Sequence, residues 1–150
     1  MLLSQYEQKM KEKNFFLLHN EIFELRLNEY EFKIYAYLIR IEDRRTYQCI
    51  VSYSAIAEAV GFAVNTVAKY VRTLEERGLI RTEHTEFVTK DGRKRNGCLR
   101  YHILPFRQAL DRHRERRLAE LELATARQRT KAKAEKLGIG FIPAGDGQSA

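Results

Sequence analysis

Between residues 28 and 78, apolar residues recur at spacings of three and four in three successive segments, which predicts three helices that each bury one face. The first helix begins after Asn28, whose side chain can accept a hydrogen bond from the first helical turn. Glu31, three residues later, completes a capping-box pattern, and the helix is expected to end near Glu42 and Asp43. Its inward side chains are expected to be Phe32, Tyr35, Ala36, Leu38 and Ile39.

The second and third helices are short and close together. Ser52 is the expected cap of a helix that runs to about Val60, and Gly61 ends it as a left-handed residue would. Three residues later a third helix begins, and Gly78 stops it. Four of its apolar residues lie within about a quarter turn of one another, so they predict a narrow buried stripe. They are Val64, Val67, Val71 and Leu74.

Strand-like segments surround the three helices. The run from Cys49 to Val51 is short and partly β-branched, which favours a brief strand. After Gly78 two β-rich runs, 79–89 and 98–104, are joined by the basic stretch KDGRKRNG at 90–97. Because this joint holds Asp-Gly and Asn-Gly, the pattern predicts a two-stranded hairpin with a long basic tip.

The two ends of the chain are less patterned. Residues 1–27 are expected to form an N-terminal arm, in which the apolar run Phe15 to Leu18 is either an extended segment or a packed turn. Residues 105–137 are rich in helix formers and predict a basic helix without a heptad of leucines. The Gly-rich residues 138–150 predict a disordered tail.

The order helix, strand, helix, tight turn, helix, hairpin over residues 28–104 resembles a winged helix-turn-helix domain. The residues that carry this resemblance are Ala57 at the helix crossing, Gly61 in the turn, Val67 and Val71 facing inward, and LEERGLI leading into the hairpin. The expected fold is therefore mainly α with a small β-hairpin wing on a three-helix core. The resemblance implies sequence-specific binding of double-stranded DNA by a small bacterial transcriptional regulator.

A narrower resemblance rests on FELRLNEYEFKIYAYLIRIEDRRTYQC before the motif and TKDGRKRNG after it. These stretches are similar to small helix-turn-helix proteins of plasmids and conjugative elements in Gram-positive bacteria. The resemblance implies a mobile-element origin. Ala63 departs from that pattern, because such proteins usually have Ser or Thr there to cap the third helix.

The charge of the chain agrees with a polyanionic partner. The net charge is +7 over 150 residues, and the excess of Lys and Arg falls C-terminal to residue 89. A near-neutral body with a basic flank favours nucleic acid over a membrane surface. The sequence has no apolar run of 18 residues, no signal-peptide pattern and no paired cysteines, so we expect a cytoplasmic protein.

The candidate contacts follow from the outward face of the third helix and from the basic wing. A helix fits the major groove, where Asn can pair with adenine and Lys can reach guanine. The expected base contacts are Asn65, Thr66, Lys69 and Thr73. The expected backbone contacts are Ser52, Tyr53, Tyr70, Arg72 and Arg77. The expected wing contacts, to the backbone or the minor groove, are Lys90, Arg93, Lys94 and Arg95.

Other functional classes have less support. His19, His84, His102 and His113 are isolated, and no nucleophile, phosphate-loop or metal-ligand motif accompanies them, so we expect no enzyme activity, metal or cofactor. A replication-initiator-like protein is an alternative, which the short chain disfavours, because an initiator usually carries further domains. An accessory DNA-binding protein is an alternative that a short chain can accommodate. RNA binding is another alternative, without an aromatic stacking platform to support it.

Two further points stay open in the sequence. A protein-docking winged helix would use Tyr30, Tyr35 and Tyr37, although core or dimer contacts are the preferred interpretation of these tyrosines. The 105–137 helix has three open interpretations: it contacts nucleic acid through its basic end, residues 127–133, it forms a homodimer through leucines, or it is a solvated extension. The leucines considered are Leu110, Leu118 and Leu121. No effector-binding domain is evident, so control by a small molecule is not implied.

Overall fold

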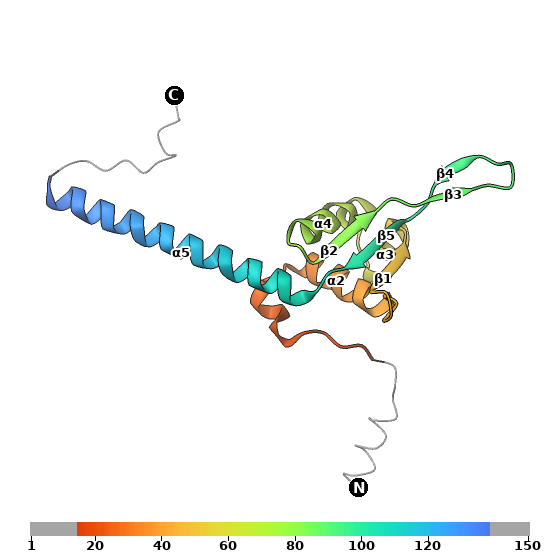
Figure 1. The fold of residues 1–150 in the computed structure, drawn as a ribbon, viewed down its shortest axis with the longest axis horizontal. Coiled ribbons are helices and arrows are strands. Elements are labelled where there is room, and N and C mark those ends of the chain that lie inside the picture. Colours follow the sequence, from red (N-terminus) through yellow and green to blue (C-terminus); the bar gives the residue numbers. More distant parts are fainter. Residues whose placement is uncertain (1–14, 139–150) are drawn as a thin grey trace, which may run out of the picture. The chain divides into compact units, whose positions relative to one another are not determined.

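The computed structural model describes residues 15–138, which form a domain of short helices and strands, a distal hairpin and a long C-terminal helix (Figure 1). In chain order the elements are η1 (Asn20–Leu25), α2 (Glu29–Ile41), β1 (Gln48–Val51), α3 (Tyr53–Val60), α4 (Val64–Glu76), β2 (Ile80–Glu83), β3 (Glu86–Val88), β4 (Lys94–Asn96), β5 (Leu99–Ile103) and α5 (Phe106–Lys136). The start of the expected arm, residues 1–14, and nearly all of the expected tail lie outside the described residues.

Helix α2 begins where its capping residue predicts. The Asn28 side chain accepts a hydrogen bond from the Glu31 amide at 2.8 Å. The Glu31 side chain does not complete the capping box. Its carboxylate is buried and pairs with Arg77, the residue that follows α4. The inward face is also rotated from the prediction: Ile34 is fully buried, whereas Phe32 is only half-buried and stacks on Phe23 of η1.

Helices α3 and α4 are joined by the tight turn that the glycine predicts. Ser52 caps α3 by accepting from the Ala55 amide at 3.1 Å, and Gly61 ends it at φ 79°, in the left-handed region. The Gly61 amide donates to the Ala57 carbonyl at 2.9 Å. In α4, Val67 is fully buried, as expected from the predicted inward stripe. Val64 is 44% exposed, so its predicted inward position is wrong; the buried stripe begins one turn further into α4.

A three-stranded antiparallel sheet in the order β1-β5-β2 packs beside these helices. Tyr101 in the central strand pairs in register with Cys49 of β1 and with Thr82 of β2, and its side chain is fully buried. With this sheet, the order helix, strand, helix, helix and hairpin is the winged helix-turn-helix fold expected from the sequence.

The predicted hairpin is divided into two ladders. Strands β2 and β5 form the base, and β3 pairs with β4 to form the wing, residues 86–96. Of the two turn signals, Asp-Gly makes the tip, where the Gly92 amide donates to the Thr89 carbonyl. Asn-Gly lies instead at the junction between the ladders, where a Cβ on Gly97 would collide with the Thr85 side chain. This close approach of the two chain segments interrupts the regular pairing.

The buried core extends beyond the span expected for the domain. Ile22 and Leu25 of η1 are buried on its N-terminal side, and Phe106, Ala109 and Leu110 of α5 are buried on its C-terminal side. The ring of His19 stacks on Phe106 with centroids 4.4 Å apart. The chain therefore divides into compact units after Leu110, so the first turn of α5 belongs to the winged domain.

The second unit begins at Asp111 and contains the rest of α5. Nearly all of its described residues are exposed, and Leu118, Leu121 and Leu123 are each more than half exposed. No helix in residues 15–138 is long and apolar enough to cross a membrane.

Candidate nucleic-acid interface

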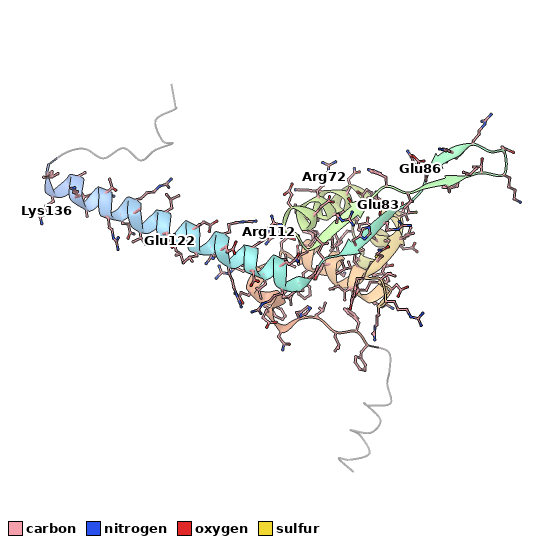
Figure 2. The ribbon with its side chains drawn as sticks, viewed as in Figure 1. Arg72, Glu83, Glu86, Arg112, Glu122 and Lys136 are labelled. Carbon is pink, nitrogen blue, oxygen red and sulfur yellow. The ribbon has the colours of Figure 1, made fainter. Side chains whose placement is uncertain are left out.

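The outward side of α4 is a ridge of polar side chains. With Val67 buried, a rotation of about 100° per residue places Asn65, Lys69 and Arg72 on the opposite side of the helix. All three are exposed, and Figure 2 labels Arg72 among the side chains projecting from α4. The ridge also carries Glu76, an exposed carboxylate near the end of the helix. Such a ridge has the width and chemistry needed to enter a major groove.

One flank of this ridge is partly covered. Thr66, Tyr70 and Thr73 are half-buried there. The Thr73 hydroxyl donates to the Tyr70 carbonyl at 2.9 Å, which leaves its oxygen as an acceptor. On the other flank Glu75 accepts from the Thr82 amide at 2.9 Å and from the Thr82 hydroxyl at 3.0 Å. Because Thr82 is in β2, this contact ties α4 to the strand that leads into the wing.

Arg77 has an internal role that its sequence position does not reveal. Its Nε lies 2.6 Å from Oε2 of Glu31, and its Nη1 donates to the Leu25 carbonyl at 3.1 Å. These contacts join α4 to α2 and η1. Glu31 is buried, so the ion pair also supplies the charge partner that a buried carboxylate needs.

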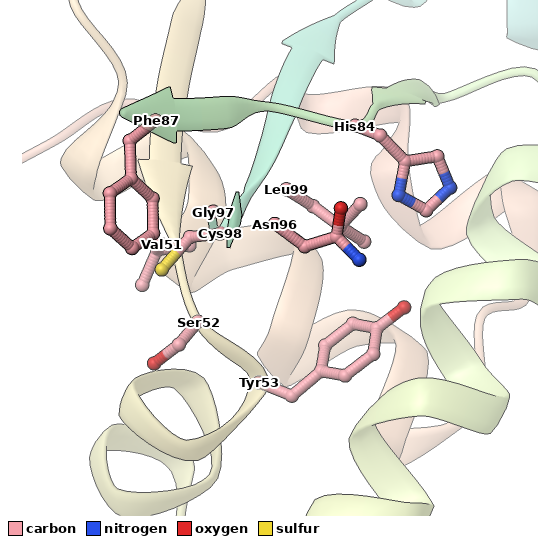
Figure 3. A pocket seen from close by; sticks show the side chains of 9 residues that line it. All are labelled: Val51, Ser52, Tyr53, His84, Phe87, Asn96, Gly97, Cys98 and Leu99. Carbon is pink, nitrogen blue, oxygen red and sulfur yellow. The ribbon is translucent and has the colours of Figure 1, made fainter. Parts of the chain in front are cut away.

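The start of α3 and the junction of the wing enclose an open groove of about 590 Å³. Its lining residues are Val51, Ser52, Tyr53, His84, Phe87, Asn96, Gly97, Cys98 and Leu99, and Figure 3 shows the side chains around it. The Ser52 hydroxyl is already used as an acceptor by the Ala55 amide, so it retains its proton for an outside partner. The predicted backbone contacts Ser52 and Tyr53 thus lie beside the wing.

The four wing cations are exposed side chains at the tip and on β4. They form no ion pair with a carboxylate among residues 15–138. Arg95 is paired across the ladder with Phe87, and Lys94 with Val88. Their charges are therefore available to an external anion.

Below the wing, the sheet holds its own charge cluster. His102 Nε2 lies 2.9 Å from Oε2 of Glu83, and Arg100 lies 3.5 Å from the same oxygen. The hydrogen bond from His102, helped by Arg100, lowers the pKa of the Glu83 carboxyl. No group of three or more His, Cys, Asp or Glu in the described part of the chain is arranged to hold a metal ion.

Sequence reasoning missed an aromatic cluster next to α4. Tyr30 of α2 stacks on Tyr70 with centroids 4.8 Å apart, and the Phe62 ring in the turn meets Tyr30 edge-on at 4.9 Å. Lys33 lies over Phe62 and Lys69 over Tyr70. These residues have no shared spacing in the chain, so only the packing of α2 against α4 reveals them. Tyr35, by contrast, is buried in the core, as preferred for the α2 tyrosines.

Comparison with known proteins agrees with the helix-turn-helix core. Residues 25–80 match the family model of a helix-turn-helix domain. No curated protein matches the chain in sequence. One similar solved structure is a "possible transcriptional regulator" of Methanosarcina mazei Go1, with 15% identity, 68% of this chain and 79% of that chain covered, and a TM-score of 0.47.

Two other similar structures are of Lactococcus lactis ZitR, described as a zinc-responsive MarR family member. One is 18% identical in sequence, with 88% of this chain and 80% of that chain covered, and has a TM-score of 0.40. The other, a cysteine-to-serine mutant in complex with DNA, has 19% identity, 88% and 79% coverage, and a TM-score of 0.39. Residues 25–80, which match the helix-turn-helix model, lie within the first compact unit.

Proposed function

We propose that this protein binds double-stranded DNA in a sequence-specific manner and acts as a small transcriptional regulator. The observation that carries the proposal is the exposed ridge of Asn65, Lys69 and Arg72 on α4, the second helix of the helix-turn-helix pair. A protein-docking winged helix would be expected to bury aromatic residues or Met at this place. The ridge instead carries side chains that suit base edges and phosphates.

The roles divide by position along α4. Asn65, Thr66 and Lys69 lie in the first half of the helix, where recognition side chains reach base edges. Thr73 follows on the same flank as Thr66 and offers an acceptor oxygen. Arg72, further along the ridge, is assigned to the phosphate backbone.

The wing and the start of α3 act on the backbone. Ser52 and Tyr53 border the groove at the wing junction, so they and the wing cations are assigned to one sugar-phosphate strand. Arg77 contributes indirectly, because its guanidinium holds α4 against Glu31 and Leu25. We therefore assign it to positioning the helix rather than to a phosphate.

The C-terminal helix α5 has a basic segment for DNA contact and exposed leucines for dimerisation. Residues 127–133 carry four Lys or Arg and no acidic residue, which suits contact with more of the duplex. Leu110 is buried in the winged domain and cannot join a dimer seam. A homodimer through α5 would therefore depend on Leu118 and Leu121, which are exposed.

The test is selection of duplexes from a random pool by the full chain, followed by binding of the selected motif at two salt concentrations. Asn65→Ala and Lys69→Ala are each expected to weaken the motif by about 1–3 kcal/mol and to relax preference at one or two base positions. If these variants lost the same amount of affinity for every DNA sequence, the assignment of base recognition to α4 would be contradicted. Binding without any enriched motif would support an accessory DNA-binding role instead.

A further inference from the structure

Two sides of α4 are bordered by different parts of the domain. Tyr70 contacts α2 through Tyr30, whereas Glu75 contacts β2 through Thr82. At about 100° per residue, Tyr70 and Glu75 are about 140° apart around the helix. Helix α2 and the wing side of the sheet therefore border α4 on opposite flanks. A helix in a major groove has one sugar-phosphate strand on each of these flanks.

The wing side already has cations for one strand, and the α2 side has a second group. Lys33 Nζ lies 5.3 Å from the centroid of the Phe62 ring, and Lys69 Nζ lies 5.2 Å from that of Tyr70. Tyr30 joins the two rings by stacking on one and meeting the other edge-on. The five residues form one continuous surface from α2 across the turn to α4.

This surface is held in place and still accessible. Lys33 and Lys69 are exposed, while the three rings are half-buried. Neither lysine forms an ion pair with a carboxylate in the part of the chain that the structure describes. Contact with an aromatic face orients an ammonium group without using its hydrogen-bond donors. Side chains that are fixed before binding lose less conformational entropy when an anion arrives.

We propose that Lys33 and Tyr30 form a second phosphate-binding site, which holds the DNA strand on the flank of α4 opposite the wing. The inference rests on the proposed function and extends it to the second strand. Lys33 supplies charge and Tyr30 a hydroxyl donor, with Phe62 and Tyr70 as their support. Lys69 stands between this site and the base edges. The site recognises a phosphodiester, so it acts on every DNA sequence alike.

The test uses the full chain with Lys33→Gln, which removes the charge and retains most of the stem. Arg40→Gln is the matched control, because Arg40 is exposed and lies seven residues away on nearly the same face of α2. Lys33→Gln is expected to weaken selected and random duplexes by the same factor and to reduce the slope of log affinity against log salt by about 0.9. Arg40→Gln is expected to leave both unchanged.

Phosphate-ethylation interference then locates the contact. Wild-type protein should be sensitive to ethylation on both strands, and Lys33→Gln should lose this sensitivity on one strand only. Tyr30→Phe should weaken binding in the same sequence-independent way while leaving the melting temperature near that of the wild type.

The second site would be overturned if Lys33→Gln left the salt slope unchanged. It would also be overturned if Arg40→Gln lost as much DNA affinity as Lys33→Gln. Neither result would affect motif selection by the wild-type chain, which tests the proposed function separately. If the wild type binds duplexes without selecting a motif, the salt slope and the ethylation pattern still decide the Lys33 site. If it binds no duplex at low salt, the proposed function and the second site both fail.

Discussion

Ala63 occupies the capping position of α4 and provides no side-chain acceptor for the first turn. Its backbone is already extended, with φ −68° and ψ 149°, and its carbonyl accepts from the Val67 amide at 3.1 Å. Only the side chain is therefore missing from a normal N-cap. The departure from the expected Ser or Thr is local and has not changed the course of the chain.

Ala63→Ser is expected to stabilise the protein by about 1 kcal/mol, because a hydroxyl there can accept from the first-turn amides. Urea unfolding of both proteins checks the value. Ala63→Asp is the comparison: it should stabilise the fold by a similar amount but weaken DNA binding, since it adds a negative charge at the start of α4, which we propose to lie against DNA. A gain in DNA affinity for the Asp variant would contradict the placement of α4 against phosphates.

The two cysteines differ in burial and in their electrostatic surroundings. Cys98 is exposed at the wing junction, whereas Cys49 is buried in β1 and its pKa is raised to about 11 by desolvation and by the nearby Glu42 charge. At pH 8 a thiol reagent should therefore label one cysteine in the native protein and two after denaturation. Mass spectrometry of the labelled peptides identifies which cysteine has reacted.

The raised pKa of Cys49 also makes the stability of the fold depend on pH. Because the pKa of the thiol is raised in the folded state, its contribution to stability is present below pH 9 and is lost as the pH rises through about 11.

At the scale of elements, the wing is connected to α4 as well as to the sheet. Glu75 of α4 accepts two hydrogen bonds from Thr82 of β2, and the β2–β5 ladder continues into the wing through the junction at Gly97. The wing itself, residues 86–96, is largely exposed. Its three-residue strands are held by one short ladder.

Replacing Arg93, Lys94 and Arg95 together with Gln should weaken binding to all duplexes alike, because these charges face no base edge in the proposed arrangement. The salt slope should fall by about 0.9 for each phosphate that the variant no longer neutralises, while the selected motif stays the same. Arg44→Gln with Arg45→Gln, two exposed arginines outside the wing, is the control. A changed motif in the wing variant would assign base recognition to the wing.

At the scale of the whole molecule, the winged domain ends inside a helix. Phe106, Ala109 and Leu110 are buried with the core, and the remaining residues of α5 belong to the second unit. The continuous helical composition of residues 106–136 hides this boundary in the sequence.

A chain that ends at Asp111 should keep the stability of the winged domain, whereas one that ends at Pro105 should lose roughly 3–6 kcal/mol with the buried Phe106 and Leu110 side chains. Urea unfolding followed by circular dichroism compares the two. Equal stability would show that the first turn of α5 is dispensable for the core. Should both chains fold, DNA binding by the longer one would also isolate the contribution of residues 112–150.

Local signals in the sequence determined the element order, the caps at Asn28 and Ser52, the turn at Gly61 and the buried stripe from Val67 to Leu74. Each depends on neighbours a few residues away, because capping, left-handed turns and helical periodicity are short-range effects. The same signals located the α4 ridge and the basic wing.

Only the tertiary structure decided which polar residues are engaged within the fold and which remain exposed. It paired Arg77 with Glu31, rotated α2 toward Ile34, divided the hairpin at Gly97 and included the first turn of α5 in the core. It also brought Tyr30 of α2 against Tyr70 of α4, with Lys33 close by over Phe62. These outcomes depend on the angle and register at which elements pack, and residues far apart in the chain set those quantities together.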